Sequence, residues 1–521
     1  MNLSKKYKFL ILLIFFLLFL KVDFRIINDL KCCQDDFDYY SHALTIAQDF
    51  DFDYSNQFES KQRYYNEELD KIAPIGFFGS GLLASPFLFL GIQLDNLFST
   101  EQNILDFKKL LYSFSSIFYL LFSLLLLSRI IKCKNSNFLL TLVLFGSGVI
   151  YYAFERFSMP HVYEVFTVSL SIYSSAKFYD SKLSSFYSAL LPISIFLGIL
   201  VRWTNYFLFL IPTIVCLLTE NRNNKLLKEK NFYIFSILSI SIFLVHSKLI
   251  YGIYTFSPFT IYGQQNLGAT VYESIFENLL TTISLLLKDI IIISFTQEFG
   301  LFWFTPALFA CLVFILINYF KFSFKEKLAT TLVLASFLQG FYTISIWEST
   351  ASSYGFRYIF STIPLSIYVL FKLNKYSNFN LLKSYLYIFS IFSLISVLFF
   401  ETTLETQLSL IPVLNSFGVE KIYSQPYYLT GVVKSLMQPD SYLKIAATSM
   451  LGSIFLKLLL HLFSYESIAD NLQNLSSSNI EDFLSFLTRV DTIGLEIFAA
   501  AILLSLIFVF YTIKYISKQS Y

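Results

Sequence analysis

Residues 110–128 read LLYSFSSIFYLLFSLLLLS and contain no charged side chain. A helix needs about 20 such residues to cross the hydrocarbon core of a bilayer. Similar stretches recur along the chain, at about 7–22, 138–153, 161–176, 186–200, 203–219, 232–249, 300–319, 328–345, 356–371, 384–400, 443–463 and 494–514. The pattern predicts an all-α polytopic membrane protein with about 11–14 transmembrane helices.

The composition supports this fold class. Apolar residues make up 55% of the 521 positions and charged residues 14%, with a mean hydropathy of +0.61. A soluble domain averages about 45–50% apolar and about 25% charged residues, and it cannot hide this much apolar side chain in one core. The net charge of +2 and the scattered basic residues do not indicate a nucleic-acid-binding protein.

The distribution of basic residues predicts the orientation. Lys5, Lys6 and Lys8 precede the first apolar stretch, and no small-residue cleavage site follows it, so we expect an uncleaved first helix with a cytoplasmic N-terminus. Lysine and arginine then recur in alternate loops, near residues 129–134, 177–182, 222–230, 321–327 and 372–383. The positive-inside rule places those loops in the cytoplasm. The intervening loops are then expected to face outward. We expect a multi-pass protein of the plasma membrane, which is the inner membrane if the cell is bacterial.

Three regions fit this scheme less simply. Segments 76–94 and 279–296 are apolar but interrupted by glycine, proline or charge, so we interpret them as interfacial or re-entrant helices. Residues 401–521 contain an outer loop and C-terminal hydrophobic segments whose topology the charges leave open. We therefore divide the chain into a transmembrane module, 1–400, and a C-terminal part, 401–521.

The longest segment outside the predicted helices is the first outer loop, residues 23–109. It is rich in acids, and aromatic side chains such as Tyr39 and Tyr40 are interleaved with them. This mixture predicts a short amphipathic helix at about 36–48, lying on the membrane surface. Asp35, Asp36 and Asp38 follow the first helix closely. There they either meet a reactant whose lipid tail stays in the bilayer or form a solvated acidic face, as most runs of charge do.

Four motifs in this chain carry a resemblance to a known family. They are DDFDYYSHAL with DFDFDYSN at 35–56, APIGFFGSGLLASPF at 73–87, GLFWFTP at 300–306, and Trp347-Glu348-Ser349 followed by SYGFRY at 353–358. Together they resemble the outer-face elements of GT-C membrane glycosyltransferases of the protein mannosyltransferase and aminoarabinose transferase type. All four fall on the side that the lysine and arginine count assigns to the outside.

The resemblance implies a transferase that moves a sugar from a polyprenyl-phosphate donor to a glycan, lipid or protein acceptor, with inversion at the sugar carbon. In such a site Asp35 or Asp36 would be the base, and the residues leave open which of them. Arg357 and Arg202, each at an outer helix end, would bind the donor phosphate. Residues with an acceptor-binding or structural role would be Asp38, Tyr39, Tyr40, His161, Glu164, Trp347 and Tyr358.

No cofactor follows from the residues themselves. Paired acids can hold a divalent cation through oxygen ligands, but the spacing shows no third ligand. Membrane lipids are the remaining expected partners. Two other function classes stay open: a polysaccharide polymerase or ligase, whose large outer loop would be expected late in the chain, and a transporter, which would place ionisable residues at mid-membrane depth.

Overall fold

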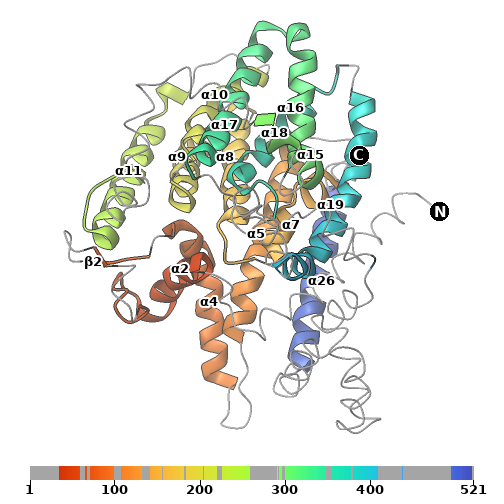
Figure 1. Cartoon of the computed structure of the whole chain (residues 1–521). Helices are drawn as coiled ribbons and strands as arrows, with labels where there is room; N and C mark the ends of the chain where they lie inside the picture. The colour runs from red at the N-terminus through yellow and green to blue at the C-terminus, as the bar shows by residue number, and fades with distance from the viewer. Residues whose placement is uncertain are drawn as a thin grey trace, which may run out of the picture. The chain divides into compact units, whose positions relative to one another are not determined.

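A computed structural model of the chain shows a predominantly helical protein (Figure 1). It describes residues 34–58, 65–66, 71–98, 107–131, 141–154, 156–180, 184–203, 205–219, 226–257, 290–295, 300–347, 354–376, 379–408, 437 and 495–518, with single gaps at 75 and 292. Four of the described helices are long and apolar enough to cross a membrane: Phe78–Phe98, Phe107–Ile131, Ser184–Val201 and Lys230–Tyr251. These helices confirm the predicted α-helical membrane architecture.

The chain divides into two compact units. The first consists of Met1–Cys32, Phe87–Phe114 and Leu398–Tyr515, and the second of Cys33–Pro86, Ser115–Val397 and Ile516–Tyr521. In the first unit, Asp95 in helix α4 (Phe78–Phe98) caps the start of helix α5 (Phe107–Ile131). Its two carboxylate oxygens accept the backbone N–H groups of Phe107 and Lys108 at 2.7 and 3.0 Å, which satisfies donors that every helix start leaves open. Helix α26 (Leu495–Lys518) carries most of its residues in the same unit.

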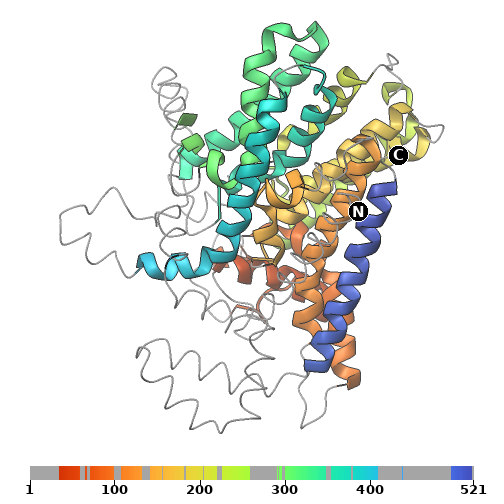
Figure 2. The same ribbon diagram turned by 90° about the vertical axis from the view of Figure 1, so that its right-hand side faces the viewer.

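The second unit holds most of the described helices. Its elements are α2 (Gln34–Leu44), which continues as a π-helical turn at Thr45–Asp49, the β1–β2 hairpin (Tyr65–Asn66 and Lys71–Ile72), α7 (Val149–Phe154), α8 (His161–Asp180), α9 (Ser184–Val201), α10 (Ile211–Leu218), α11 (Lys230–Tyr251), α15 (Leu301–Phe304), α16 (Pro306–Asn318), α17 (Phe324–Trp347), α18 (Ile363–Lys372) and α19 (Phe379–Leu408). Figure 2 shows α17 and α18 from a second direction.

Helix α8 is the buried centre of this unit. It packs against α9, α10, α18 and α7, and most of its side chains are buried. Its serines satisfy their hydroxyls inside the helix: Ser169, Ser171 and Ser175 each donate to the carbonyl four residues earlier. By contrast, α11 exposes a row of apolar residues that includes Ile234, Ile237 and Leu238. Such a surface belongs against lipid.

Two glycines bring three chain segments into close contact. A Cβ on Gly79 would lie 2.3 Å from the backbone nitrogen of Val201, at the end of α9, and a Cβ on Gly81 would lie 2.5 Å from the Cβ of His42 in α2. Only glycine permits these approaches, as in other close helix contacts in membranes. The first turn of α4 therefore holds α2 next to the end of α9.

Helix α17 begins at a polar anchor. The Glu326 carboxylate accepts the backbone N–H of Ser323 at 2.8 Å and the hydroxyl of Tyr376 at 2.7 Å, and it pairs with Lys375 at 2.9 Å. The reach from Glu326 back to Ser323 is one half of a capping box, which ends the preceding turn and starts the helix. It also ties the start of α17 to the end of α18.

Several predicted helices have the expected positions, and some differ. The amphipathic helix expected at 36–48 appears as α2 with its π-helical turn. Segment 76–94 corresponds to α4, a continuous helix of 21 residues that contains Pro86 without ending there and is long and apolar enough to cross a membrane. Its interfacial or re-entrant placement stays a prediction. The segments 138–153, 203–219 and 356–371 are each divided into a short 3₁₀ or π-helical turn and a helix. The expected helices 7–22 and 443–463 and most of 279–296 lie outside the described residues.

Candidate functional site

Two consecutive acids at the start of α2 have different surroundings. The Asp36 side chain is buried, and its Oδ2 lies 2.7 Å from Nη2 of Arg156, which is also buried. The Asp35 side chain is 47% exposed, and its Oδ2 lies 3.7 Å from Nη1 of Arg357. Successive residues of a helix point about 100° apart, which follows from 3.6 residues per turn. One acid therefore faces the interior while its neighbour faces outward toward Arg357.

The other polar residues of this helix hold it in place. Asp38 is buried and accepts the backbone N–H of Gly76 at 3.3 Å, while Tyr39 is buried and Tyr40 is half-buried. A Cβ on Gly76 would lie 3.0 Å from the Cβ of Asp38, so the loop before α4 can approach α2 only because residue 76 is glycine. The structure thus gives Asp38 a backbone contact that fixes α2.

A buried histidine provides a second anchor for α2. His42 Nε2 lies 2.9 Å from the Gly76 carbonyl oxygen, and Nδ1 lies 2.6 Å from the hydroxyl of Tyr54. A carbonyl can only accept, so Nε2 carries the proton and Nδ1 accepts from Tyr54. Tyr251 of α11 donates to the same carbonyl at 3.2 Å. Burial lowers the pKa of His42 to about 3, so the neutral ring is the form that belongs in this network.

The two arginines predicted from the sequence meet on one aromatic ring. The guanidinium carbons of Arg202 and Arg357 lie 5.1 and 5.3 Å from the centre of the Tyr358 ring. Arg202 follows the end of α9, and Arg357 begins the 3₁₀ turn Arg357–Thr362 before α18. Gly355, with a φ of +61°, precedes this turn and allows the chain to reverse. The ring face attracts both cations and holds them in the same region.

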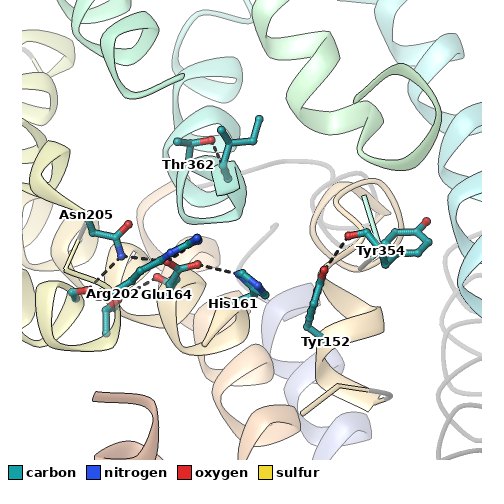
Figure 3. Close-up of polar contacts among 10 residues, drawn as sticks. Tyr152, His161, Glu164, Arg202, Asn205, Tyr354 and Thr362 are labelled. Carbon is teal, nitrogen blue, oxygen red and sulfur yellow. Dashed lines mark hydrogen bonds and ion pairs between the residues drawn. The ribbon is translucent and has the colours of Figure 1, made fainter. Parts of the chain in front are cut away.

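Glu164 connects Arg202 to a histidine. One carboxylate oxygen, Oε1, lies 3.5 Å from Arg202 Nη1 and accepts Asn205 Nδ2 at 3.3 Å; the other, Oε2, lies 3.1 Å from His161 Nδ1. Figure 3 shows these four side chains converging from α8 and the end of α9. All four are buried, so the carboxylate is paired where an isolated charge would be costly.

Aromatic residues surround His161 on its other side. The Tyr152 ring lies 4.4 Å from the imidazole ring, and its hydroxyl donates to the Tyr354 carbonyl at 2.9 Å (Figure 3). Phe360 packs edge-on against the same imidazole at 5.7 Å. These contacts fix the orientation of the histidine ring and join α7 to the segment that carries Arg357.

The structure brings most of the predicted site residues together. Asp35 contacts Arg357, and Arg202, Glu164, His161 and Tyr358 form one connected cluster beside it. Trp347 ends α17, and its side chain lies outside the described residues. The sequence did not single out Arg156 or Asn205. Arg156 follows an aromatic stretch, and Asn205 lies three residues after Arg202. For Arg156, a charged side chain close to the end of the predicted helix 138–153 was the available signal; for Asn205 the sequence held none.

The described acids do not make a metal site. Within the described part of the chain, no group of three or more histidine, cysteine, aspartate or glutamate side chains could hold a metal ion. The three acids of α2 are directed to different partners: Asp36 to Arg156, Asp38 to a backbone N–H and Asp35 to Arg357. These three carboxylates therefore do not converge on one point at which a divalent cation could bind.

Comparison with known proteins gives structural neighbours only. No protein-family model and no curated protein sequence matches the chain. The apo crystal structure of the Archaeoglobus fulgidus oligosaccharyltransferase is similar with a TM-score of 0.42 and 14% identity, over 90% of this chain and 60% of that chain. Its complex with Zn and sulfate gives 0.41 and 14%, over 81% and 52%. The archaeal oligosaccharyltransferase AglB from the same organism, in complex with an inhibitory peptide and a dolichol-phosphate, gives 0.40 and 13%, over 90% and 60%.

The chain thus spans about 60% of the length of the first of these proteins. The function proposed below rests on the geometry of the site.

Proposed function

We propose that this protein is a membrane glycosyltransferase that moves a sugar from a polyprenyl-phosphate donor to an acceptor hydroxyl at the outer face of the membrane. One observation carries the proposal: a half-exposed carboxylate, Asp35, lies against the guanidinium of Arg357, whose side chain is 12% exposed, with Arg202 on the same Tyr358 ring. Sugar transfer from a lipid phosphate requires a proton acceptor and a cation close together, and this pair supplies both.

The reaction follows from these two groups. The acceptor oxygen attacks the sugar carbon that bears the phosphate, and its proton moves to the Asp35 carboxylate. The bond between that carbon and the phosphate oxygen breaks, and the electron pair leaves with the polyprenyl phosphate. Arg357 and Arg202 stabilise the charge that develops on the phosphate, because guanidinium groups bind phosphate oxygens through paired hydrogen bonds. A single direct displacement of this kind inverts the sugar carbon.

The geometry favours Asp35 over Asp36 as the base. Asp36 is 1% exposed and is bound at 2.7 Å by Arg156, so an acceptor hydroxyl would have to displace a buried ion pair to reach it. Asp35 is 47% exposed, and its contact with Arg357 is the longer one at 3.7 Å. A donor phosphate can replace that long contact on Arg357 and leave the carboxylate facing the acceptor. On this proposal, Asp36 positions the helix and Asp35 reacts.

The test is a transfer assay on membranes that contain the protein, with a panel of labelled polyprenyl-phosphate sugars and membrane extract as the acceptor source. We expect the wild type to transfer label from at least one donor and Asp35→Asn to lose at least about 100-fold of that rate, the lower end of what a general base contributes. Asp53→Asn is the matched control: it is an exposed acid of the same loop whose oxygen accepts the Ser55 N–H.

We expect Asp53→Asn to keep the wild-type rate. Wild-type membranes that transfer no sugar from any donor would overturn the proposed function. Equal rates for Asp35→Asn and the wild type would agree with the proposed transferase activity but would overturn the role of Asp35 as its base.

A further inference from the structure

The candidate site contains buried polar atoms whose hydrogen-bonding capacity is not used. Among the described residues, His161 Nε2, Asp36 Oδ1 and Arg357 Nε are buried and have no hydrogen-bond partner. An atom of this kind in a protein interior is costly, and it calls for a specific explanation such as a bound polar group. The three atoms include a donor, Arg357 Nε, and an acceptor, Asp36 Oδ1. Of these atoms, His161 Nε2 and Arg357 Nε belong to the cluster formed with Glu164, Arg202 and Tyr358, and their unused hydrogen-bonding capacity points to a polar occupant there.

The hydrogen bonds of His161 determine what its free nitrogen can do. Glu164 receives Asn205 Nδ2 and the Arg202 guanidinium on one oxygen, so the carboxylate acts as an acceptor. The ring nitrogen facing its other oxygen, Nδ1, therefore carries the proton. In the neutral ring, Nε2 then holds a lone pair and no hydrogen. A carboxylate that fixes the tautomer of a histidine in this way leaves the opposite nitrogen free to accept.

The position of this acceptor relates it to the phosphate-binding arginines. Glu164 bridges His161 and Arg202, and Arg202 shares the Tyr358 ring with Arg357. Both guanidinium groups lie within electrostatic range of the imidazole. If the arginines bind the donor phosphate, the sugar attached directly to that phosphate lies next to it. Every polyprenyl-phosphate sugar carries hydroxyl groups on its sugar, and these are neutral hydrogen-bond donors that can reach His161 from a phosphate bound to the arginines.

We propose that His161 is a specificity residue that accepts, at Nε2, a hydrogen bond from a hydroxyl group of the donor sugar. The inference rests on the proposed function and adds the chemical feature by which the site selects its donor. The acceptor substrate is the less suitable partner for His161. It must reach the proposed base, Asp35, which is half-exposed. His161 is only 1% exposed and lies among Tyr152, Phe360 and Glu164.

The experiment compares three forms of the protein with the active donor and its monodeoxy analogues, each lacking one sugar hydroxyl. His161→Asn keeps an amide N–H near the position of Nδ1, for Glu164, and lacks an acceptor at the position of Nε2. His161→Gln places its amide oxygen near Nε2 and supplies the acceptor again. Tyr368→Phe is the matched control, because it removes another buried polar atom without a hydrogen-bond partner among the described residues, in helix α18.

For the wild type and Tyr368→Phe, we expect one monodeoxy donor to have a kcat/KM about tenfold or more below that of the full donor. The hydroxyl missing from that donor is the one that would pair with His161, so the buried acceptor on the histidine stays without a hydrogen bond. For His161→Asn, we expect the full donor to be slowed by a similar factor and the same monodeoxy donor to be slowed no further. His161→Gln should recover part of the difference. Such non-additivity is the sign of a direct contact between the altered groups.

The two proposals fail in different ways. If every monodeoxy donor loses the same factor in His161→Asn as in the wild type, His161 does not contact the sugar, and only the present inference is overturned. A poorly folded His161→Asn is recognised by its thermal stability, and His161→Ala, which also lacks an acceptor at the position of Nε2, then provides the same comparison. If the wild type transfers no sugar from any donor, the proposed function is overturned and the inference with it.

Discussion

Replacing Asp36 with asparagine should destabilise the protein far more than the same replacement at Asp35. The two positions are adjacent in helix α2 and receive the same chemical change, from a carboxylate to an amide of equal size. They differ in their surroundings. The Asp36–Arg156 pair has a 2.7 Å contact between side chains that are 1% and 4% exposed, whereas the Asp35–Arg357 pair has a 3.7 Å contact and a carboxylate that is 47% exposed.

The magnitudes follow from burial. Removing one partner of a buried ion pair leaves the other charge uncompensated and costs about 3–5 kcal/mol. We expect a cost toward the lower end of this range for Asp36→Asn, because it removes the carboxylate that the buried Arg156 guanidinium contacts at 2.7 Å. Exposed pairs are worth about 0–1 kcal/mol, and a solvated carboxylate at 3.7 Å belongs to that class. Replacing both buried partners with apolar side chains, Asp36→Leu with Arg156→Met, should recover most of the loss, since both buried charges are then removed together.

The assay is thermal unfolding of the purified protein in detergent, followed by tryptophan fluorescence, for the two single asparagine variants, Arg156→Met and the double variant. We expect Asp36→Asn and Arg156→Met to unfold at clearly lower temperatures than the wild type. Asp35→Asn should unfold within about a degree or two of it, in keeping with a loss of about 0–1 kcal/mol. Equal destabilisation by Asp35→Asn and Asp36→Asn would refute the division between them. So would a double variant whose loss is the sum of the two single losses.

Three further predictions concern the supports of the site. Gly79→Ala should destabilise the second unit by about 1–3 kcal/mol, because the new Cβ would meet the Val201 backbone, and thermal unfolding measures it. Burial lowers the pKa of His42 from 6.5 to about 3, so the buried neutral ring contributes its full stability above pH 6.5. Between pH 6.5 and about 3, the free energy of unfolding falls by about 1.4 kcal/mol per pH unit, because only the unfolded state binds the proton. The unfolding temperature of His42→Gln should therefore depend less on pH in this range than that of the wild type. Glu326→Ala should cost about 1 kcal/mol in thermal unfolding, because Ser323 loses its capping partner, and Glu326→Gln should recover part of this.

Apolar runs without charge were sufficient to predict several of the helices. The stretches 110–128, 161–176, 186–200 and 232–249 correspond to α5, α8, α9 and α11, each one to a few residues longer at one or both ends. Membranes make this signal strong, because a spanning backbone must satisfy its own hydrogen bonds and a helix does so. The signal was weaker wherever a helix was interrupted. Glycine and proline in 76–94 suggested a break, but Gly79 and Gly81 serve close packing, and Pro86 is accommodated inside α4.

Long-range polar pairs were predicted only in part. The proximity of Asp35 and Arg357 was expected because both lie in outer-face motifs, and the structure places them in contact. The partner of Asp36 was not expected. Arg156 is separated from it by 120 positions, and neither periodicity nor spacing connects two charges so far apart in the sequence. Burial identifies such a partner, because an unpaired carboxylate is not stable inside a protein, but burial is known only when the helices are packed.

Asp35 and Asp36, at the start of α2, have different roles that depend on the same helix orientation. A helix that projects one acid toward an outer-face site must itself be held against the rest of the protein, and α2 offers few apolar side chains for this in its first turn. Because residues one apart in a helix point about 100° away from each other, the acid next to the exposed one faces inward. There Asp36 meets Arg156 and fixes the rotation of the helix about its axis. On the function proposed here, shifting the acidic pair one residue toward the C-terminus would place the reacting carboxylate at position 36, where the side chain is buried.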